Sequence, residues 1–278
     1  GVLSKSADAY VIDNVELPFL NPWRRNIRLA DIGFFGDGRA AAVTFDGDVW
    51  MIRGLEGNLE RVSWRRFASG LHEPMSLVVR DGDVLVHDRN GIWRLRDDDG
   101  DGEAEVHELF SNAFGQTAET REFATGMRVA PDGTLVISKG GQQGTTVGRH
   151  NGTVLRVSRD GGHVDVLGWG LRMPFIGVHP TTGLVTASDQ QGNYVPMTPL
   201  HVIRDGRYYG FIPMILPRER YPAPIEEPMV WIPHAVNASG VSQAWLADSR
   251  MGPLAGGLIH LGYYRPELFA VLWDRRGP

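Results

Sequence analysis

The sequence predicts an all-β protein of the β-propeller class, and two observations carry this prediction. The phrase Gly70-Leu71-His72-Glu73-Pro74 returns one hundred residues later as Gly170-Leu171-Arg172-Met173-Pro174, and an apolar run and a turn follow each copy. Glycine turns of the same kind recur at spacings of 44, 51 and 50 residues, at Gly38, Gly82, Gly133 and Gly183. A repeat of roughly 40 to 50 residues built from short strands is typical of a propeller blade with four strands.

Period-two alternation between glycine-bounded ends predicts the strands of each blade in order. In the first two blades we expect strands near residues 28–35, 40–45, 48–53 and 59–68, then 75–80, 83–87, 91–96 and 104–110. In the third blade we expect them near 123–130, 134–138, 152–158 and 163–168. These strands predict a single domain over residues 1–278, with blades at about 28–68, 75–110, 123–168, 174–212 and 234–272.

The expected propeller is of the six-bladed type, with about five blades visible in the chain. A full sixth blade is missing after Trp273. The segment Ala9–Asp13 can supply one strand of a closing blade, because a propeller ring must be sealed to protect its strand edges. Truncation of the chain, an unusual ring closure and an edge supplied by a partner stay open as alternatives.

Composition agrees with this fold and excludes several function classes. With 42% hydrophobic residues, 35 Gly and 17 Pro among 278 residues, the chain can bury a core but is interrupted too often for long helices. A net charge of −5 gives no basic field for DNA or RNA. No apolar stretch is long enough for a membrane span, and we see no signal peptide. The absence of Cys excludes disulfides, a thiol nucleophile and thiolate metal sites.

An acidic segment at residues 97–108 has the spacing of a calcium loop. Carboxylates at loop positions 1, 3 and 5, a glycine at the tight turn (Gly102) and acidic residues at positions 9 and 12 follow the ligand order that Ca²⁺ prefers. The flanking segments look like strands, so a structural ion would clamp a hairpin of the second blade. A solvated acidic turn is the alternative. The predicted ligands are Asp97, Asp99, Asp101, Glu103, Glu105 and Glu108.

Polar residues gather in the loops that a propeller directs toward one end of its axis. One loop class joins the second strand of a blade to the third, and it contains residues 87–90, 139–151, 188–194 and 248–250. The other class leads into the inner strand of the next blade, and it contains residues 72–73, 121–122, 172 and 233–234. Together they predict a polar mouth of mixed charge, suited to a hydroxyl-rich or anionic small ligand. Each residue alone can equally be a surface charge or an inter-blade hydrogen-bonding group.

Several phrases resemble the propeller domains of the glucose/sorbosone dehydrogenase superfamily. They are residues 47–50, 66–71, 97–105, 150–158 and 231–234. The likeness is greatest to large secreted propeller proteins of planctomycete-type bacteria, which are often fused to cytochrome c modules, and it covers most of residues 8–272. The resemblance implies pyrroloquinoline quinone (PQQ) at the channel mouth, oxidation of a sugar hydroxyl, a periplasmic or extracellular location and a cytochrome c electron acceptor.

The resemblance extends only partly to the functional residues. The quinone-contacting phrase Gly-x-Arg-Asn-Pro of the superfamily corresponds to residues 170–174, so Arg172 is kept and the Asn is replaced by Met173. Where the dehydrogenases place a His base, this chain has Arg121-Glu122. A buried carboxylate at that place can accept a hydroxyl proton, although a rim charge is the alternative.

Two functions therefore stay open, besides a structural or assembly role. In a quinoprotein dehydrogenase of sugars or polyols, Arg172 and Lys139 would face the quinone, with Glu122 or His150 as the base. In a propeller without quinone, a sugar or acidic glycan would be bound, or cleaved by elimination, by a histidine beside Arg172. The candidate catalytic residues are Glu122, His150 and His72, with His234 as a further histidine. The candidate cofactor-binding residues are Arg172, Lys139, Gln142, Arg149, His234 and Arg250.

Overall fold

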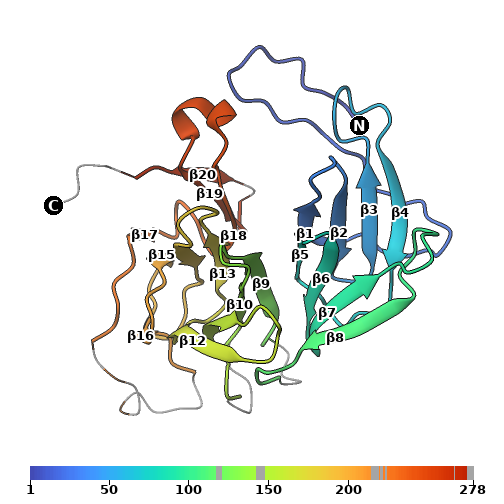
Figure 1. Ribbon diagram of the computed structural model, residues 1–278. Coiled ribbons are helices and arrows are strands. Elements are labelled where there is room, and N and C mark those ends of the chain that lie inside the picture. The colour runs from blue at the N-terminus through green and yellow to red at the C-terminus, as the bar shows by residue number, and fades with distance from the viewer. Residues whose placement is uncertain are drawn as a thin grey trace. The chain divides into compact units, whose positions relative to one another are not determined.

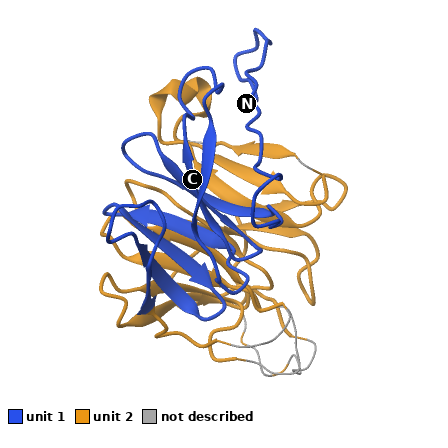
Figure 2. Ribbon diagram, turned by 90° about the vertical axis from the view of Figure 1, so that its right-hand side faces the viewer, with its two compact units in different colours: residues 1–110 blue, residues 111–278 orange. Residues whose placement is uncertain are grey.

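The computed structural model describes residues 1–116, 121–141, 148–213, 219, 222, 224–265 and 267–273. It divides into two compact units, Gly1–Phe110 and Ser111–Pro278, called here the N-terminal and C-terminal units (Figure 2). Each unit is described by itself, and the expected single domain stays a prediction. No helix in the described part of the chain is long and apolar enough to cross a membrane.

The N-terminal unit holds two four-stranded antiparallel sheets, each with its strands in chain order (Figure 1). The first contains β1 Leu29–Phe34, β2 Ala40–Thr44, β3 Val49–Arg53 and β4 Ser63–Ala68. The second contains β5 Ser76–Arg80, β6 Asp83–Asp88, β7 Gly91–Arg96 and β8 Val106–Ser111. Gly33 of β1 lets the sheets approach closely, because a Cβ there would lie 2.7 Å from a methyl carbon of Leu77.

The C-terminal unit holds three further sheets. The first has the order β16-β12-β11-β10-β9, with β9 Ala124–Val129, β10 Leu135–Lys139, β11 Thr153–Val157, β12 Val164–Trp169 and β16 Arg207–Tyr208. The second contains β13 Phe175–Val178, β14 Val185–Ser188, β15 Thr198–Val202 and β17 Val230–Ile232. The third contains β18 Gly240–Trp245, β19 Leu258–Gly262 and β20 Leu268–Val271, with the short 3-10 helix η2 Ser249–Leu254 between its first two strands.

Both cores are built from the alternating apolar residues that predicted the strands. In the N-terminal unit Val43, Val49, Leu77 and Val86 belong to one buried cluster drawn from both sheets. In the C-terminal unit Val136 and Ile176 belong to a corresponding cluster. Five sheets and almost no helix in the described residues confirm the predicted all-β fold with about five blades.

The fourth sheet differs from the prediction at its outer edge. We expected this blade to end near residue 212, but its outer strand is β17, and β16 instead joins β12 of the preceding sheet as a parallel strand. An aromatic contact explains this, because the rings of Trp169 and Tyr208 lie 4.6 Å apart. Gly170, with φ of 77°, leaves room for the Tyr208 ring.

The N-terminal segment forms no strand over residues 9–13, where a closing strand was one of the alternatives. Its backbone hydrogen bonds instead join Val2 with Asn14, at 2.7 and 2.9 Å. Tyr10, Val11 and Ile12 are exposed, so this apolar run is not buried against a neighbouring strand in the N-terminal unit.

Candidate functional site

The two Gly-Leu-x-x-Pro phrases are each held by a buried aspartate. In the C-terminal unit Asp189 accepts the backbone N–H of Arg172 at 2.7 Å and that of Met173 at 2.6 Å. In the N-terminal unit Asp88 accepts the backbone N–H of His72 at 2.9 Å. Both carboxylates follow or end the second strand of a blade, so the repeat fixes the loop that carries the third residue of each phrase.

A glycine supports each phrase from the neighbouring loop. Leu71 donates its backbone N–H to Gly47 O at 3.2 Å, and Leu171 donates to Gly152 O at 3.1 Å. A Cβ at Gly47 would lie 2.3 Å from Leu71 O, and one at Gly152 would lie 2.2 Å from Leu171 O. Both glycines have positive φ, so other residues are excluded by backbone strain and by contact.

Glu122 and His150 lie in one buried cluster of the C-terminal unit. Glu122 is 3% exposed and His150 is 4% exposed. Asn151 donates from Nδ2 to Glu122 Oε1, which links the carboxylate to the loop of His150. We call Glu122, Lys139, His150 and Asn151, with Gln116, the mouth cluster.

The protonation of His150 is set by its surroundings. Gly115 donates its backbone N–H to His150 Nδ1 at 2.7 Å, so a neutral ring carries its proton on Nε2. Burial lowers the pKa of His150, and the charges of Arg149 and Lys139 lower it further. His150 is therefore a neutral hydrogen-bond donor at Nε2 near pH 7.

Lys139 ends strand β10 and is 1% exposed. Its Nζ donates to Gln116 Oε1 at 3.1 Å and lies 5.8 Å from the centre of the Phe114 ring. A buried ammonium group needs such partners because its desolvation is costly. Lys139 therefore contributes a buried amino group with its own polar and aromatic partners to the mouth cluster.

Arg172 adjoins this cluster through the backbone. Gly141 donates its N–H to Arg172 O at 2.7 Å, and Gly140 donates to Phe123 O at 2.9 Å, so the loops after β10, before β9 and before β13 meet. The Arg172 guanidinium donates from Nη1 to Gln191 O at 2.6 Å and to Gln190 Oε1 at 3.2 Å. Burial lowers its pKa, Asp189 raises it, and the nearby Arg121 lowers it.

The structure gathers some of the predicted residues and not others. Glu122, His150, Lys139 and Arg172 lie on adjoining loops, and Arg149 is close enough to His150 to affect its pKa. His234 is exposed in the turn after β17, and no described side-chain contact joins it to the mouth cluster. Arg250 forms an ion pair with Asp248 at 2.6 Å, and its side chain is 89% exposed. His72 lies in the other unit, and Gln142 lies outside the described residues.

The sequence analysis missed Gln116, and it placed Asn151 in the polar loop 139–151 without naming it as a candidate site residue. In the described part of the chain, Asn151 Oδ1 and Gln116 Nε2 are buried without a hydrogen-bond partner. Asn151 stands beside His150 in the sequence, and this adjacency was the available signal. Gln116 stands at no repeated position, so no pattern in the sequence points to it.

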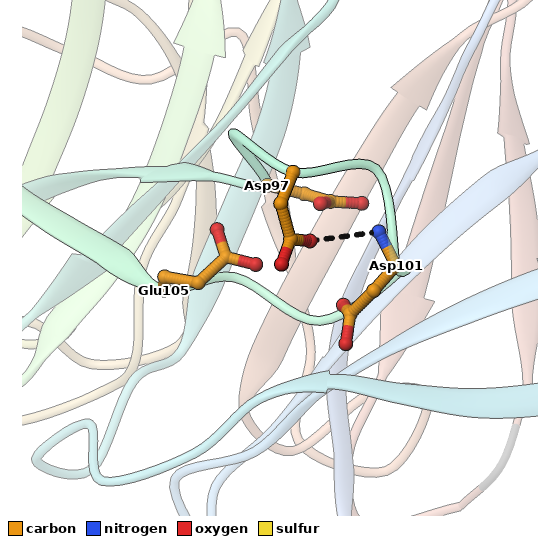
Figure 3. Close-up of side chains that lie close together, drawn as sticks. Asp97, Asp101 and Glu105 are labelled. Atoms are coloured by element: carbon orange, nitrogen blue, oxygen red, sulfur yellow. Dashed lines mark hydrogen bonds between the residues drawn. The ribbon is translucent and has the colours of Figure 1, made fainter.

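The acidic loop of the N-terminal unit brings four predicted ligands together. Carboxylate oxygens of Asp97, Asp99, Asp101 and Glu105 all lie within 4.8 Å of one another. Asp97 also accepts the backbone N–H groups of Gly100 and Gly102, at 2.7 and 2.8 Å, which shapes the loop. Figure 3 shows the carboxylates of Asp97 and Glu105 facing each other across it. This set of oxygen donors suits Ca²⁺.

The two remaining predicted ligands lie outside this group. Glu108 forms an ion pair with Arg94, since its Oε2 lies 3.6 Å from Nη1 of that arginine. Glu108 belongs to strand β8. In an EF-hand a helix follows the loop and brings the twelfth residue back to the ion, whereas here an extended strand follows it. Glu103 donates its backbone N–H to Asp101 at 2.8 Å and contributes no carboxylate to the group.

Comparison with known proteins gives a family and a fold. The model of a family described as "Domain of unknown function (DUF7133)" matches residues 57–195, which is half of the chain. No curated protein matches the chain.

Solved structures that resemble this one are propellers. The aldose sugar dehydrogenase of Streptomyces coelicolor, in its PQQ-bound form, is 13% identical with a TM-score of 0.67, over 90% of this chain and 79% of that one. The soluble aldose sugar dehydrogenase of Escherichia coli, in its apo-form, is 12% identical with a TM-score of 0.61, over 88% and 85%. Regucalcin of Agrobacterium tumefaciens, described as a calcium-binding protein, is 14% identical with a TM-score of 0.52, over 85% and 68%. These likenesses confirm the predicted β-propeller fold.

Proposed function

The chain belongs to the DUF7133 family, and we propose that it is a quinoprotein-type oxidoreductase that oxidises a sugar or polyol hydroxyl. The observation that carries this proposal is the mouth cluster, in which Asn151, the residue after the buried His150, donates a hydrogen bond to the buried carboxylate of Glu122. The propeller fold shared with sugar dehydrogenases supports the proposal. Fold alone does not establish an activity, so the argument rests on these side chains.

The cationic residues around the mouth cluster fit the carboxylates of a PQQ-type cofactor. Lys139 and Arg172 would hold it, because buried cations bind carboxylates through charge-assisted hydrogen bonds. The unpartnered Asn151 Oδ1 and Gln116 Nε2 add one acceptor and one donor. Met173 takes the place of the Asn that the resemblance implies, and its buried side chain supplies no amide contact. When bound, the quinone supplies the hydride acceptor.

The chain's own residues would bind the substrate hydroxyl and take its proton. Glu122 would accept that proton, because Asn151 fixes one carboxylate oxygen and the surrounding burial excludes water. His150 would donate a hydrogen bond from Nε2, since its Nδ1 already accepts from Gly115. The substrate would thus give its hydroxyl proton to Glu122 and a hydride to the bound quinone, which leaves a carbonyl group as the oxidised product.

Calcium is the second part of the proposal. Asp97, Asp99, Asp101 and Glu105 would bind Ca²⁺ and stabilise the hairpin between β7 and β8. The ion would be structural, since the loop is exposed and belongs to the N-terminal unit. The structural likeness to regucalcin, a calcium-binding protein, agrees with this.

A second candidate function is supported by Met173. Because this residue removes an expected quinone contact, the same cations would instead hold the carboxylate of an acidic glycan, bound or cleaved by elimination. Under either function we propose a periplasmic or extracellular location. For the oxidoreductase we propose a cytochrome c as electron acceptor.

Difference absorbance of the purified protein, titrated with PQQ, tests the oxidoreductase proposal. We expect a saturable change in the quinone absorbance, lost in Lys139→Met, which removes the charge while keeping an unbranched apolar side chain. Arg250→Lys is the matched control, since Arg250 is exposed and paired with Asp248. A wild-type protein that gives no saturable change would leave the acidic-glycan function as the better account.

A further inference from the structure

A groove on the face of the first sheet contains no residue of the mouth cluster and shares Asp97 and Asp101 with the proposed calcium loop. It has a volume of about 460 Å³ and is lined by strands β3 and β4 and by the acidic loop. This volume is within the range of small-molecule sites, about 300 to 1,000 Å³. The whole groove belongs to the N-terminal unit.

Strand register places two arginines on the same face of this groove. Met51 pairs with Arg65 and Arg53 pairs with Ser63 across β3 and β4. Since side chains alternate between the faces of a sheet, Arg53 and Arg65 share a face with Met51 and Phe67. The groove therefore combines two guanidinium groups with an apolar floor.

Both arginines are exposed on the surface of the N-terminal unit. In the described part of the chain no hydrogen bond or ion pair joins the side chain of Arg53 or Arg65 to a carboxylate. A third lining arginine, Arg39, is already paired with Asp37 at 2.8 Å.

The carboxylates in the acidic wall of the groove accept hydrogen bonds from the backbone of their own loop. Asp97 accepts from two backbone N–H groups of its own loop, and Asp101 Oδ1 accepts from the backbone of Glu103 at 2.8 Å. Gly102 lies against Arg65, since a Cβ there would be 2.7 Å from Nη1 of that arginine. Arg65 thus lies against the acidic loop, and the Asp97 and Asp101 carboxylates of that loop accept backbone N–H groups whether or not they also bind Ca²⁺.

We propose that this groove binds a small anionic ligand, by a carboxylate, sulfate or phosphate group held between Arg53 and Arg65. Guanidinium groups bind such oxyanions through paired N–H donors, and the apolar floor of Met51 and Phe67 suits a ring attached to the anion. An acidic sugar is the ligand class that matches both features. The site is separate from the mouth cluster.

NMR titration of the full chain with sodium glucuronate, inorganic sulfate and neutral glucose tests this site. We expect glucuronate to shift resonances of β3 and β4 saturably, sulfate to compete with it and glucose to do neither. Arg53→Ala and Arg65→Ala should each weaken binding by about 10-fold or more, the effect of losing a hydrogen bond to a charged group. Arg61→Ala is the matched control, because Arg61 is exposed in the same unit and does not line the groove.

The mouth cluster is a second place where glucuronate can bind, so the titrations are repeated in Arg172→Ala protein. Shifts of β3 and β4 that persist there, and that Arg65→Ala removes, support the groove. Competition by sulfate but not by glucose identifies the oxyanion as the recognised group, while sulfate binding without glucuronate binding would restrict the site to inorganic anions and overturn the acidic sugar. Glucuronate affinity unchanged by both arginine variants, or equal to that of glucose, would overturn the proposal even if the mouth cluster binds as proposed.

Discussion

Asp189 holds Arg172 by its backbone, accepting the N–H of that residue at 2.7 Å across a separation of 17 residues. Asp88 holds His72 in the same way in the N-terminal unit, across 16 residues. The sequence repeat that predicts the propeller thus marks a loop whose backbone is held by an aspartate, and it occurs once in each unit. The third position can differ in charge between the two copies, because the aspartate contacts only the backbone N–H of that residue.

Replacing this aspartate should change the pH dependence of stability. Burial raises the pKa of Asp189 to about 6, against three backbone hydrogen bonds to its carboxylate. Because the folded-state pKa lies above the unfolded value of 3.8, the stability from this group is present below about pH 4 and is lost as the pH rises through 6. We expect the stability of wild type relative to Asp189→Asn to fall by about 3 kcal/mol between pH 4 and 7, measured by urea unfolding.

Asp132→Asn provides a control of opposite sign. The pKa of Asp132 is lowered by the Thr134 hydroxyl and backbone N–H, so its contribution to stability is present above the unfolded value and is lost as the pH falls. If the stability differences of both variants from wild type showed the same pH trend, burial of Asp189 would not be the cause of the pH-dependent loss of stability.

Calcium should stabilise the N-terminal unit through four carboxylates. We expect chelation to lower the melting temperature of the protein, and Asp97→Asn to abolish that effect, since Asp97 contributes to the oxygen cluster. Saturation at 100 times the Kd corresponds to roughly 2.7 kcal/mol. Calorimetry with and without chelator measures the change in melting temperature.

Glu108→Gln separates this site from an EF-hand loop. Because Glu108 pairs with Arg94 and lies outside the oxygen cluster, we expect the calcium affinity of this variant to equal that of wild type. A loss of affinity as large as that of Asp97→Asn would show that the twelfth loop position binds the ion.

Arg172→Ala should weaken ligand binding at the mouth under either proposed function. The guanidinium is half-buried and is steered by Gln190 and Gln191, so its loss should cost about 1.5 to 3 kcal/mol of binding free energy for a carboxylate ligand. Isothermal titration with PQQ and with a uronate measures this. Arg250→Ala should leave both affinities unchanged, and equal losses in the two variants would contradict the assignment of Arg172 to the site.

The blades could be predicted because their strands repeat and alternate, whereas the site could be predicted only in part. The strands at residues 40–44 and 135–139, which lie where the repeat predicts them, are buried along their whole length. The hydrogen bond between Asn151 and Glu122 joins residues 29 apart in different loops, and no local pattern encodes such a contact. The outer strand Val230–Ile232 follows a long connection, so the repeat spacing fails there.

The acidic loop, too, could be predicted from the sequence only in part. Its spacing correctly pointed to Asp97, Asp99, Asp101 and Glu105 as one oxygen cluster. The EF-hand ligand order includes position 12 because two helices bring it back to the ion. Here a strand follows the loop, and Glu108 extends along β8 toward Arg94.

Dye-linked oxidation of sugars by the PQQ-loaded protein, compared with Glu122→Gln, tests whether Glu122 acts as the general base of a sugar oxidoreductase. Glutamine keeps the shape of the buried side chain and cannot accept the substrate proton. We predict that wild type reduces the dye and that Glu122→Gln loses at least about 100-fold in rate, the usual contribution of a general base, while its quinone absorbance change is retained. Equal rates in the two proteins, with quinone bound to both, would contradict the account.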